Sequence, residues 1–175
     1  DSMKTYLSIC LSLVLITSCG NMSKTNPAKE KKYKIIYNVY APDSLAPSNY
    51  EVFSINMDGT GDTNLTQHKD VAWCYYADKN KIYFVSDRDT SYRYYLLYSM
   101  NLKGGDIKKV TDLRLEDSWM SSTNNGTELV VVGRDDKYIR HQLFILNTKD
   151  GSYKQITNDT AAYFGDPVFS PDGKQ

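Results

Sequence analysis

Apolar and polar positions alternate in short blocks along most of this chain. Between Val71 and Thr111, runs rich in Val, Ile, Tyr and Phe are separated by clusters of Asp, Asn, Gly and Ser. Runs of this kind are typical of antiparallel strands joined by tight turns. Because the same pattern occurs before and after this stretch, the sequence predicts an all-β protein.

One run recurs at a fixed interval. Ile35, Ile82 and Leu129 begin equivalent runs, so each copy starts 47 residues after the one before it. A second anchor has the form apolar, aromatic, any residue, apolar, Asn, and a Thr follows that Asn by ten residues in every copy. Its Asn and Thr positions are Asn56 and Thr66, Asn101 and Thr111, and Asn147 and Thr157.

A period in the high forties is typical of β-propeller blades, whose repeats run about 40–50 residues. A single four-stranded blade cannot bury both of its faces, so blades stack around an axis. The sequence therefore predicts a propeller of four-stranded antiparallel blades, with about three blades and the start of a fourth. The expected ranges are about 34–66, 71–111 and 117–157, with the fourth starting in 164–175.

Three segments carry a family resemblance. Ile82–Asp89, Leu97–Gly105 and Phe169–Lys174 resemble the TolB-like propeller repeat, which also occurs in the propeller domains of prolyl-oligopeptidase-type serine peptidases. The resemblance covers residues 34–175 and implies envelope proteins as partners, bound by a propeller face. It is specific for the fold and weak for function, because the same blade serves scaffolds, binding proteins and peptidases.

The predicted blades are too few to close a ring, since natural propellers have roughly 4–8. The chain also stops inside a repeat, directly after Ser170–Lys174. We therefore expect an N-terminal piece of a longer propeller, in preference to an assembly of several copies. The first blade has no inner strand of its own before Lys34, as a ring closed by a C-terminal segment would require.

Residues 1–19 have the features of a lipoprotein signal peptide. Lys4 supplies a positive charge, and the apolar run Tyr6–Ile16 is too short to span a membrane. Ile16–Cys19 then resembles a bacterial lipobox, which implies lipid attachment at Cys19 and cleavage before it. The alternative is a plain secretory signal with an incidental cysteine.

The lipobox implies a membrane-anchored lipoprotein of the bacterial cell envelope, in the periplasm or at the outer membrane. Residues 20–33 are polar and lack apolar periodicity, so we expect a flexible tether. Cys10 and Cys19 belong to the leader, which leaves Cys74 without a disulfide partner in the folded part. Because Cys74 falls in the strand nearest the propeller axis, we expect a buried free thiol.

Charge and motifs exclude several classes of function. Acidic and basic residues number 21 each, so no basic excess favours nucleic acid. The sequence has no Gly-x-Ser-x-Gly elbow, no His-Glu-x-x-His, no Cys-x-x-Cys pair and no phosphate-binding glycine loop. His68 and His141, its two histidines, fall at positions that we expect to face solvent. We predict no catalytic residue, no cofactor and no metal site.

Repeated acids were weighed as a cation site. Asp87–Asp89 and Arg134–Asp136 occupy equivalent turns, and Asp117 and Asp166 precede inner strands. Acids at one end of a propeller can ring the channel and bind calcium. Since Asp also caps its own backbone in turns, the turn role is the favoured interpretation.

Two features indicate a binding surface. The aromatic run Tyr92–Tyr98 is expected to be the third strand of its blade, where exposed tyrosines could bind a glycan or a peptide. The loop Ala41–Asn49, with Pro42 and Pro47, is the main irregular segment of the first blade. Insertions of this kind often belong to a binding face.

The interpretation from sequence is a lipid-anchored envelope propeller that acts as a non-catalytic protein-binding or scaffold module. The alternative is the propeller domain of a prolyl-oligopeptidase-type serine peptidase, or of a propeller polysaccharide lyase or hydrolase, whose catalytic part lies beyond Gln175. Enzymatic activity therefore stays open. Downstream sequence with a Gly-x-Ser-x-Gly motif, an Asp and a His would favour the peptidase.

Overall fold

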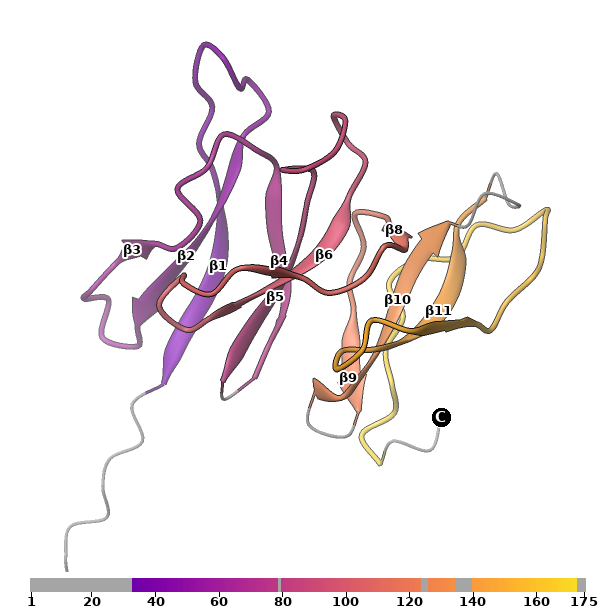
Figure 1. Ribbon diagram of the computed structural model, residues 1–175. Helices are drawn as coiled ribbons and strands as arrows, with labels where there is room; N and C mark the ends of the chain where they lie inside the picture. The colour runs from indigo at the N-terminus through magenta and orange to yellow at the C-terminus, as the bar shows by residue number, and fades with distance from the viewer. Residues whose placement is uncertain (1–32, 79, 124–125, 135–139, 173–175) are drawn as a thin grey trace, which may run out of the picture. The chain divides into compact units, whose positions relative to one another are not determined.

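The computed structural model describes residues 33–78, 80–123, 126–134 and 140–172, and the elements assigned there, β1 to β12, are all strands (Figure 1). They form three antiparallel sheets. The predicted all-β fold is therefore confirmed. The leader, most of the tether and Cys19 lie outside the described residues. No helix within the described ranges is long and apolar enough to cross a membrane.

The first sheet has the order β1-β2-β3 and is drawn in indigo and purple in Figure 1. It contains β1 (Lys34–Tyr40), β2 (Tyr50–Asn56) and the short β3 (Thr63–Asn64). The second sheet has four strands in sequence order, β4 (Ala72–Ala77), β5 (Lys81–Ser86), β6 (Leu96–Asn101) and β7 (Lys108–Lys109). It matches the arrangement expected for one blade.

The third sheet has an inner edge made of two short strands. Both β8 (Arg114–Leu115) and β9 (Ser121–Thr123) pair with β10 (Glu128–Arg134). On its other side β10 pairs with β11 (Gln142–Asn147), which pairs with β12 (Tyr153–Gln155). Residues 164–172 hold no strand, although Phe169 N donates a hydrogen bond to Ser121 Oγ at 2.7 Å. The opening of a fourth blade there stays a prediction.

The two sequence anchors face each other in the same register in all three sheets. The equivalent pairs are Ile35 with Ile55, Ile82 with Met100, and Leu129 with Leu146. The Asn of the second anchor ends its strand and turns the chain. Asn101 Oδ1, for example, accepts hydrogen bonds from Lys103 N at 2.9 Å and from Gly105 N at 3.0 Å. The Asn anchor thus encodes the turn that follows the third strand of each unit.

The Thr that follows each anchor has two different roles. Thr66 Oγ1 accepts a hydrogen bond from Val52 N at 3.0 Å, and Thr157 Oγ1 accepts one from Leu143 N at 2.9 Å. In both sheets the hydroxyl therefore extends the pairing of the outer strand. Thr111 Oγ1 instead donates to Gly151 O of the next sheet at 2.9 Å.

Apolar side chains fill two clusters that join neighbouring sheets. One lies where the first sheet packs on the second, and includes Val52, Ala72 and Phe84. The other lies between the second and third sheets, and includes Val85, Leu97 and Leu129. Because each cluster draws on two sheets, neither sheet buries its apolar face alone, which is the packing logic of a propeller.

Two equivalent glycines bring neighbouring sheets into backbone contact. Gly104 and Gly151 have φ of +83° and +73°, and a Cβ at either would lie under 3.0 Å from a carbonyl oxygen of the preceding sheet's outer segment, Leu65 O or Val110 O. Gly59 holds the equivalent turn of the first sheet with φ +81° and has nothing within 4 Å. The sequence repeat therefore carries a contact between sheets as well as a turn.

Cys74 lies in β4 and is a half-buried free thiol. Burial raises its pKa to about 12. The backbone of Cys74 also contacts the first sheet, because its N donates to Asn38 Oδ1 at 2.8 Å and its O accepts from Asn38 Nδ2 at 3.3 Å. The ladder between β4 and β5 is irregular at this point, between Cys74 and Tyr76.

Candidate functional site

A cavity of about 570 Å³ opens between three loops of the first two sheets. These loops connect β1 to β2, β3 to β4 and β5 to β6, and they lie at one end of their sheets. Small-molecule and peptide side-chain sites commonly have volumes of about 300–1,000 Å³. The lining residues are Leu45, Ala46, Pro47, Ser48, Asn49, Lys69, Asp70, Val71, Asp87, Arg88, Thr90 and Tyr92.

The loop from Ala41 to Asn49 is held in place by its own hydrogen bonds. Asp43 Oδ1 accepts from Leu45 N at 2.7 Å and from Ala46 N at 2.9 Å. Asn49 Nδ2 donates to Ala41 O at 3.0 Å across the base of the loop. These contacts preorganise one wall of the cavity, which is the loop that the sequence singled out as a binding feature.

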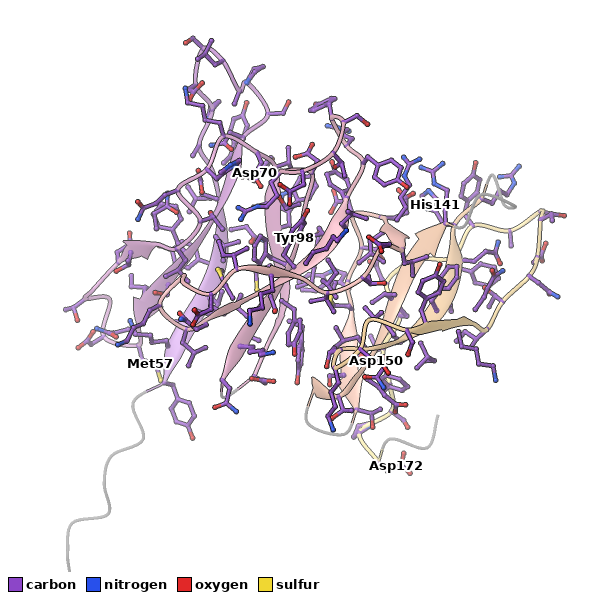
Figure 2. The ribbon with its side chains drawn as sticks, viewed as in Figure 1. Met57, Asp70, Tyr98, His141, Asp150 and Asp172 are labelled. Carbon is purple, nitrogen blue, oxygen red and sulfur yellow. The ribbon has the colours of Figure 1, made fainter. Side chains whose placement is uncertain are left out.

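The floor of the cavity contains a buried ion pair. Arg88 Nε lies 3.3 Å from Asp70 Oδ2, and the two side chains are 9% and 2% exposed. Ser86 Oγ donates a short hydrogen bond to the same carboxylate oxygen. Asp70, labelled in Figure 2, comes directly before β4, so its position follows from the end of the preceding outer strand.

Aromatic rings fix the Arg88 guanidinium from within the second sheet. Its central carbon lies 5.2 Å from the centroid of the Phe84 ring and 5.5 Å from that of Tyr98. Tyr98, also labelled in Figure 2, donates a hydrogen bond from its hydroxyl to Asp89 Oδ2 at 2.8 Å. Burial is the main reason that the pKa of Tyr98 is raised. Arg88 is thus a positioned cation, not a mobile surface side chain.

Asn49 belongs to a second buried polar group beside the cavity. Its Nδ2 donates to Glu51 Oε1 at 3.2 Å, and the other oxygen of Glu51 accepts a short hydrogen bond from Thr66 Oγ1. His68 N also donates to Glu51 Oε1, at 3.1 Å. Glu51 is therefore a buried carboxylate satisfied by the residues that shape the loop before β4.

Two buried polar atoms of the lining residues lack a hydrogen-bond partner within the described residues. They are Arg88 Nη2, a donor, and Asn49 Oδ1, an acceptor. Leaving a buried polar group unsatisfied costs about 1–3 kcal/mol. Asp70 Oδ1 differs, because it lies 3.1 Å from His68 Nδ1 and accepts a hydrogen bond when that nitrogen is protonated.

The acids predicted to cap turns are engaged in hydrogen bonds. Asp87 Oδ1 accepts from Val71 N at 3.0 Å and Oδ2 accepts from Arg93 N at 2.8 Å. Asp117 accepts from the Tyr75 hydroxyl, and Asp166 Oδ1 accepts from Ser118 Oγ at 3.1 Å. The described part of the chain contains no group of three or more His, Cys, Asp or Glu that could hold a metal ion. Asp135 and Asp136 lie outside that part.

The aromatic run Tyr92–Tyr98 does not form one exposed strand. β6 begins at Leu96, and Tyr95 and Tyr98 are buried. Tyr92 is 65% exposed and lines the cavity. Its hydroxyl bonds to Ser48 Oγ at 3.0 Å, and this bond and one from Arg93 lower its pKa. The possible glycan or peptide surface is therefore reduced to Tyr92, on a loop.

The two histidines do not meet. His141 Nε2 lies 3.4 Å from Glu116 Oε2 in the third sheet, whereas His68 contacts Asp70 in the loop before β4. Both side chains are partly exposed, at 30% and 52%. Neither histidine is among the residues that line the cavity.

Sequence reasoning missed Asn49, Asp70 and Arg88 as a group. They lie on three loops that the chain order separates, and only strand pairing brings them to one cavity. Two signals were present in the sequence. Asp70 directly precedes an apolar inner strand, and Arg88 stands between two turn-forming aspartates.

No family model matches this chain, and no curated protein matches it. Solved structures do. TolB from Acinetobacter baumannii superposes with a TM-score of 0.63 at 18% identity, over 81% of this chain and 34% of that one. A protein designated TolB from Agrobacterium tumefaciens superposes with a TM-score of 0.53 at 17% identity, over 70% of this chain and 44% of that one. At such identities the likeness shows a shared β-propeller fold, which confirms the fold predicted from the repeat.

Proposed function

We propose that this chain is part of a lipid-anchored β-propeller of the bacterial cell envelope that acts as a non-catalytic protein-binding or scaffold module. The observation that carries the proposal is the preorganised cavity with an unpartnered donor and an unpartnered acceptor. Such atoms are costly in the free protein and are satisfied when a ligand binds. The likeness to TolB structures supports the envelope setting.

Lipid anchoring rests on the sequence. Cys19 follows Ile16–Ser18 in a lipobox-like order, and residues 20–33 provide a polar spacer before β1. A tether of this length and polarity would let a folded propeller reach partners near the membrane surface.

The lining favours binding over acyl transfer. The Ser48 hydroxyl is hydrogen-bonded to Tyr92, and the Thr90 hydroxyl donates to the main-chain oxygens of Asp87 and Tyr94. A serine or threonine nucleophile needs a neighbouring base to accept its proton. Among the described residues, no histidine stands beside either hydroxyl in the lining to serve as that base.

The anchor is tested by labelling cells with a radioactive or alkyne-bearing fatty acid. We expect the label on the wild-type protein in the membrane fraction, and its loss, with release from the membrane, in Cys19→Ser. Cys10→Ser is the matched control and should keep both label and membrane location. Equal labelling of wild type and Cys19→Ser would overturn the anchoring proposal.

Protein binding is tested by photo-crosslinking in the native envelope. A photoreactive phenylalanine analogue replaces Tyr92 at the cavity or Tyr153 on β12, which is 47% exposed in the third sheet. We expect discrete higher-mass adducts from position 92 and few from position 153. If position 92 gives no protein adduct in intact cells, the protein-binding role of this face is wrong.

A further inference from the structure

The cavity contains one donor that is held in place and lacks a partner. Arg88 Nε bonds to Asp70 Oδ2 at 3.3 Å and to Ser86 Oγ at 3.4 Å, and rings on either side fix the guanidinium plane. With the side chain only 9% exposed, Nη2 has no hydrogen-bond partner among the described residues. This nitrogen therefore requires an acceptor from a ligand.

The same cavity contains an acceptor in the equivalent condition. Both hydrogens of Asn49 Nδ2 are used, toward Ala41 O and Glu51 Oε1. Because both partners are acceptors, the amide orientation is fixed and Oδ1 cannot exchange places with Nδ2. Asn49 is 6% exposed, and its Oδ1 has no donor within the described part of the chain. It requires a donor from a ligand.

We propose that this cavity recognises a carboxamide, the side chain of a Gln or Asn in a segment of a partner protein. A carboxamide offers a carbonyl oxygen to Arg88 Nη2 and an NH₂ group to Asn49 Oδ1. The proposal rests on the proposed protein-binding function, since it names the group of the partner that this cavity binds.

Singly functional ligand groups fit less well. A carboxylate only accepts hydrogen bonds, so it would leave Asn49 Oδ1 unpaired and would lie near the Asp70 carboxylate. An ammonium only donates, so it would leave Arg88 Nη2 unpaired. The two cations and two anions that line the cavity, Lys69 and Arg88 with Asp70 and Asp87, also balance in formal charge.

The rest of the lining suits the methylenes of such a side chain better than a sugar. Leu45, Pro47 and Val71 present apolar surface, and sugar hydroxyls there would lose their hydrogen bonds to water. Tyr92 is the exposed aromatic ring of the lining, and the Arg93 guanidinium lies 5.4 Å from its centroid. One face of that ring is thus already covered, which weakens it as a platform for a sugar.

The experiment is an NMR titration of the full-length protein, labelled with ¹⁵N, with three capped amino acids. N-acetylglutamine methylamide carries the carboxamide, N-acetylglutamate methylamide the carboxylate, and N-acetylleucine methylamide an apolar side chain on the same backbone. We expect the Arg88 Nε–H signal and the Asn49 side-chain NH₂ signals to shift with the Gln compound. Its Kd should be at least about tenfold lower than those of the other two, since each leaves buried groups unpaired.

Variants separate recognition from stability. Arg88→Lys keeps a cation beside Asp70 and removes Nη2, so it should abolish the preference for the Gln compound. Arg140→Lys, which alters a guanidinium on the Tyr163 ring of another segment, should leave the preference unchanged. If Arg88→Lys does not fold, Leu45→Ala is the substitute. Leu45 is 77% exposed, so its truncation should weaken binding of all three compounds without unfolding the protein.

Several outcomes overturn the carboxamide proposal. They are equal affinity for the Gln and Leu compounds, tighter binding of the Glu compound, no shift up to the solubility limit, or a shift of the same signals by N-acetylglucosamine. Each leaves the crosslinking result at Tyr92 untouched. A partner crosslinked at position 92 without a carboxamide preference would therefore disprove this inference and keep the proposed function.

Discussion

The Asp87 carboxylate connects two loops of the cavity. One oxygen accepts from Val71 N, where β4 begins, and the other accepts from Arg93 N in the loop before β6. Arg93 has φ +61°, a left-handed conformation that costs a non-glycine residue free energy. The hydrogen bond from its backbone offsets that cost, so Asp87 determines where Tyr92 stands.

Asp87→Ala should lower the free energy of unfolding by about 2–4 kcal/mol, because a buried carboxylate loses two backbone donors. Urea denaturation followed by circular dichroism measures the change. Asp58→Ala is the matched control, since Asp58 is exposed and bonds only to Thr60, and should cost under about 1 kcal/mol. Equal losses in the two variants would contradict a linking role for Asp87.

Cys74 should react slowly in the native state. Burial raises its pKa to about 12, so at pH 8 only about one thiol in 10⁴ is ionised, against about one in ten for a free cysteine. In a Cys10→Ser/Cys19→Ser form, reaction with a disulfide reagent should be at least about 100-fold slower in buffer than in guanidinium. Similar rates in both solvents would show that the thiol is open to solvent.

At the scale of the elements, the repeat determined most of what could be predicted. The anchors at Ile35, Ile82 and Leu129 correctly located β1, β5 and β10, because a period of 47 residues returns each strand to the same place in its sheet. The divided inner edge of the third sheet was not predicted, since Arg114–Leu115 is short and polar residues separate it from β9. The cavity was not predictable, because its polar atoms meet only through loop conformations that periodicity does not encode.

The contact between neighbouring sheets gives a prediction for equivalent turns. Gly104→Ala and Gly151→Ala should each destabilise the protein by about 1–3 kcal/mol more than Gly59→Ala. All three changes place a side chain at positive φ, but only the first two force a Cβ against the backbone of the preceding sheet. Thermal or urea unfolding measures the three variants side by side. Equal costs would mean that the sheets do not meet at these turns.

For the whole molecule, buried ionisable groups determine how stability depends on pH. Burial raises the pKa of Cys74 to about 12 and raises those of Tyr75, Tyr95 and Tyr98 above their ordinary value of 10.0. As pH rises above about 9, the unfolded chain loses these protons first and therefore binds fewer protons than the native protein. Stability that is fully present below pH 9 is then lost as pH increases. Each group contributes about 1.4 kcal/mol per pH unit while only its unfolded form ionises.

The urea midpoint should therefore fall between about pH 9 and pH 11, at a protein concentration low enough to prevent association. Tyr98→Phe removes one of the four groups, along with its hydrogen bond to Asp89. Its midpoint should be lower than that of wild type at pH 8, and should fall less steeply above pH 10. An exposed tyrosine is the matched control, and Tyr153→Phe should leave the slope unchanged. A midpoint independent of pH over this range would mean that these side chains are solvated in the native protein, and that the two cores are less closed than their packing indicates.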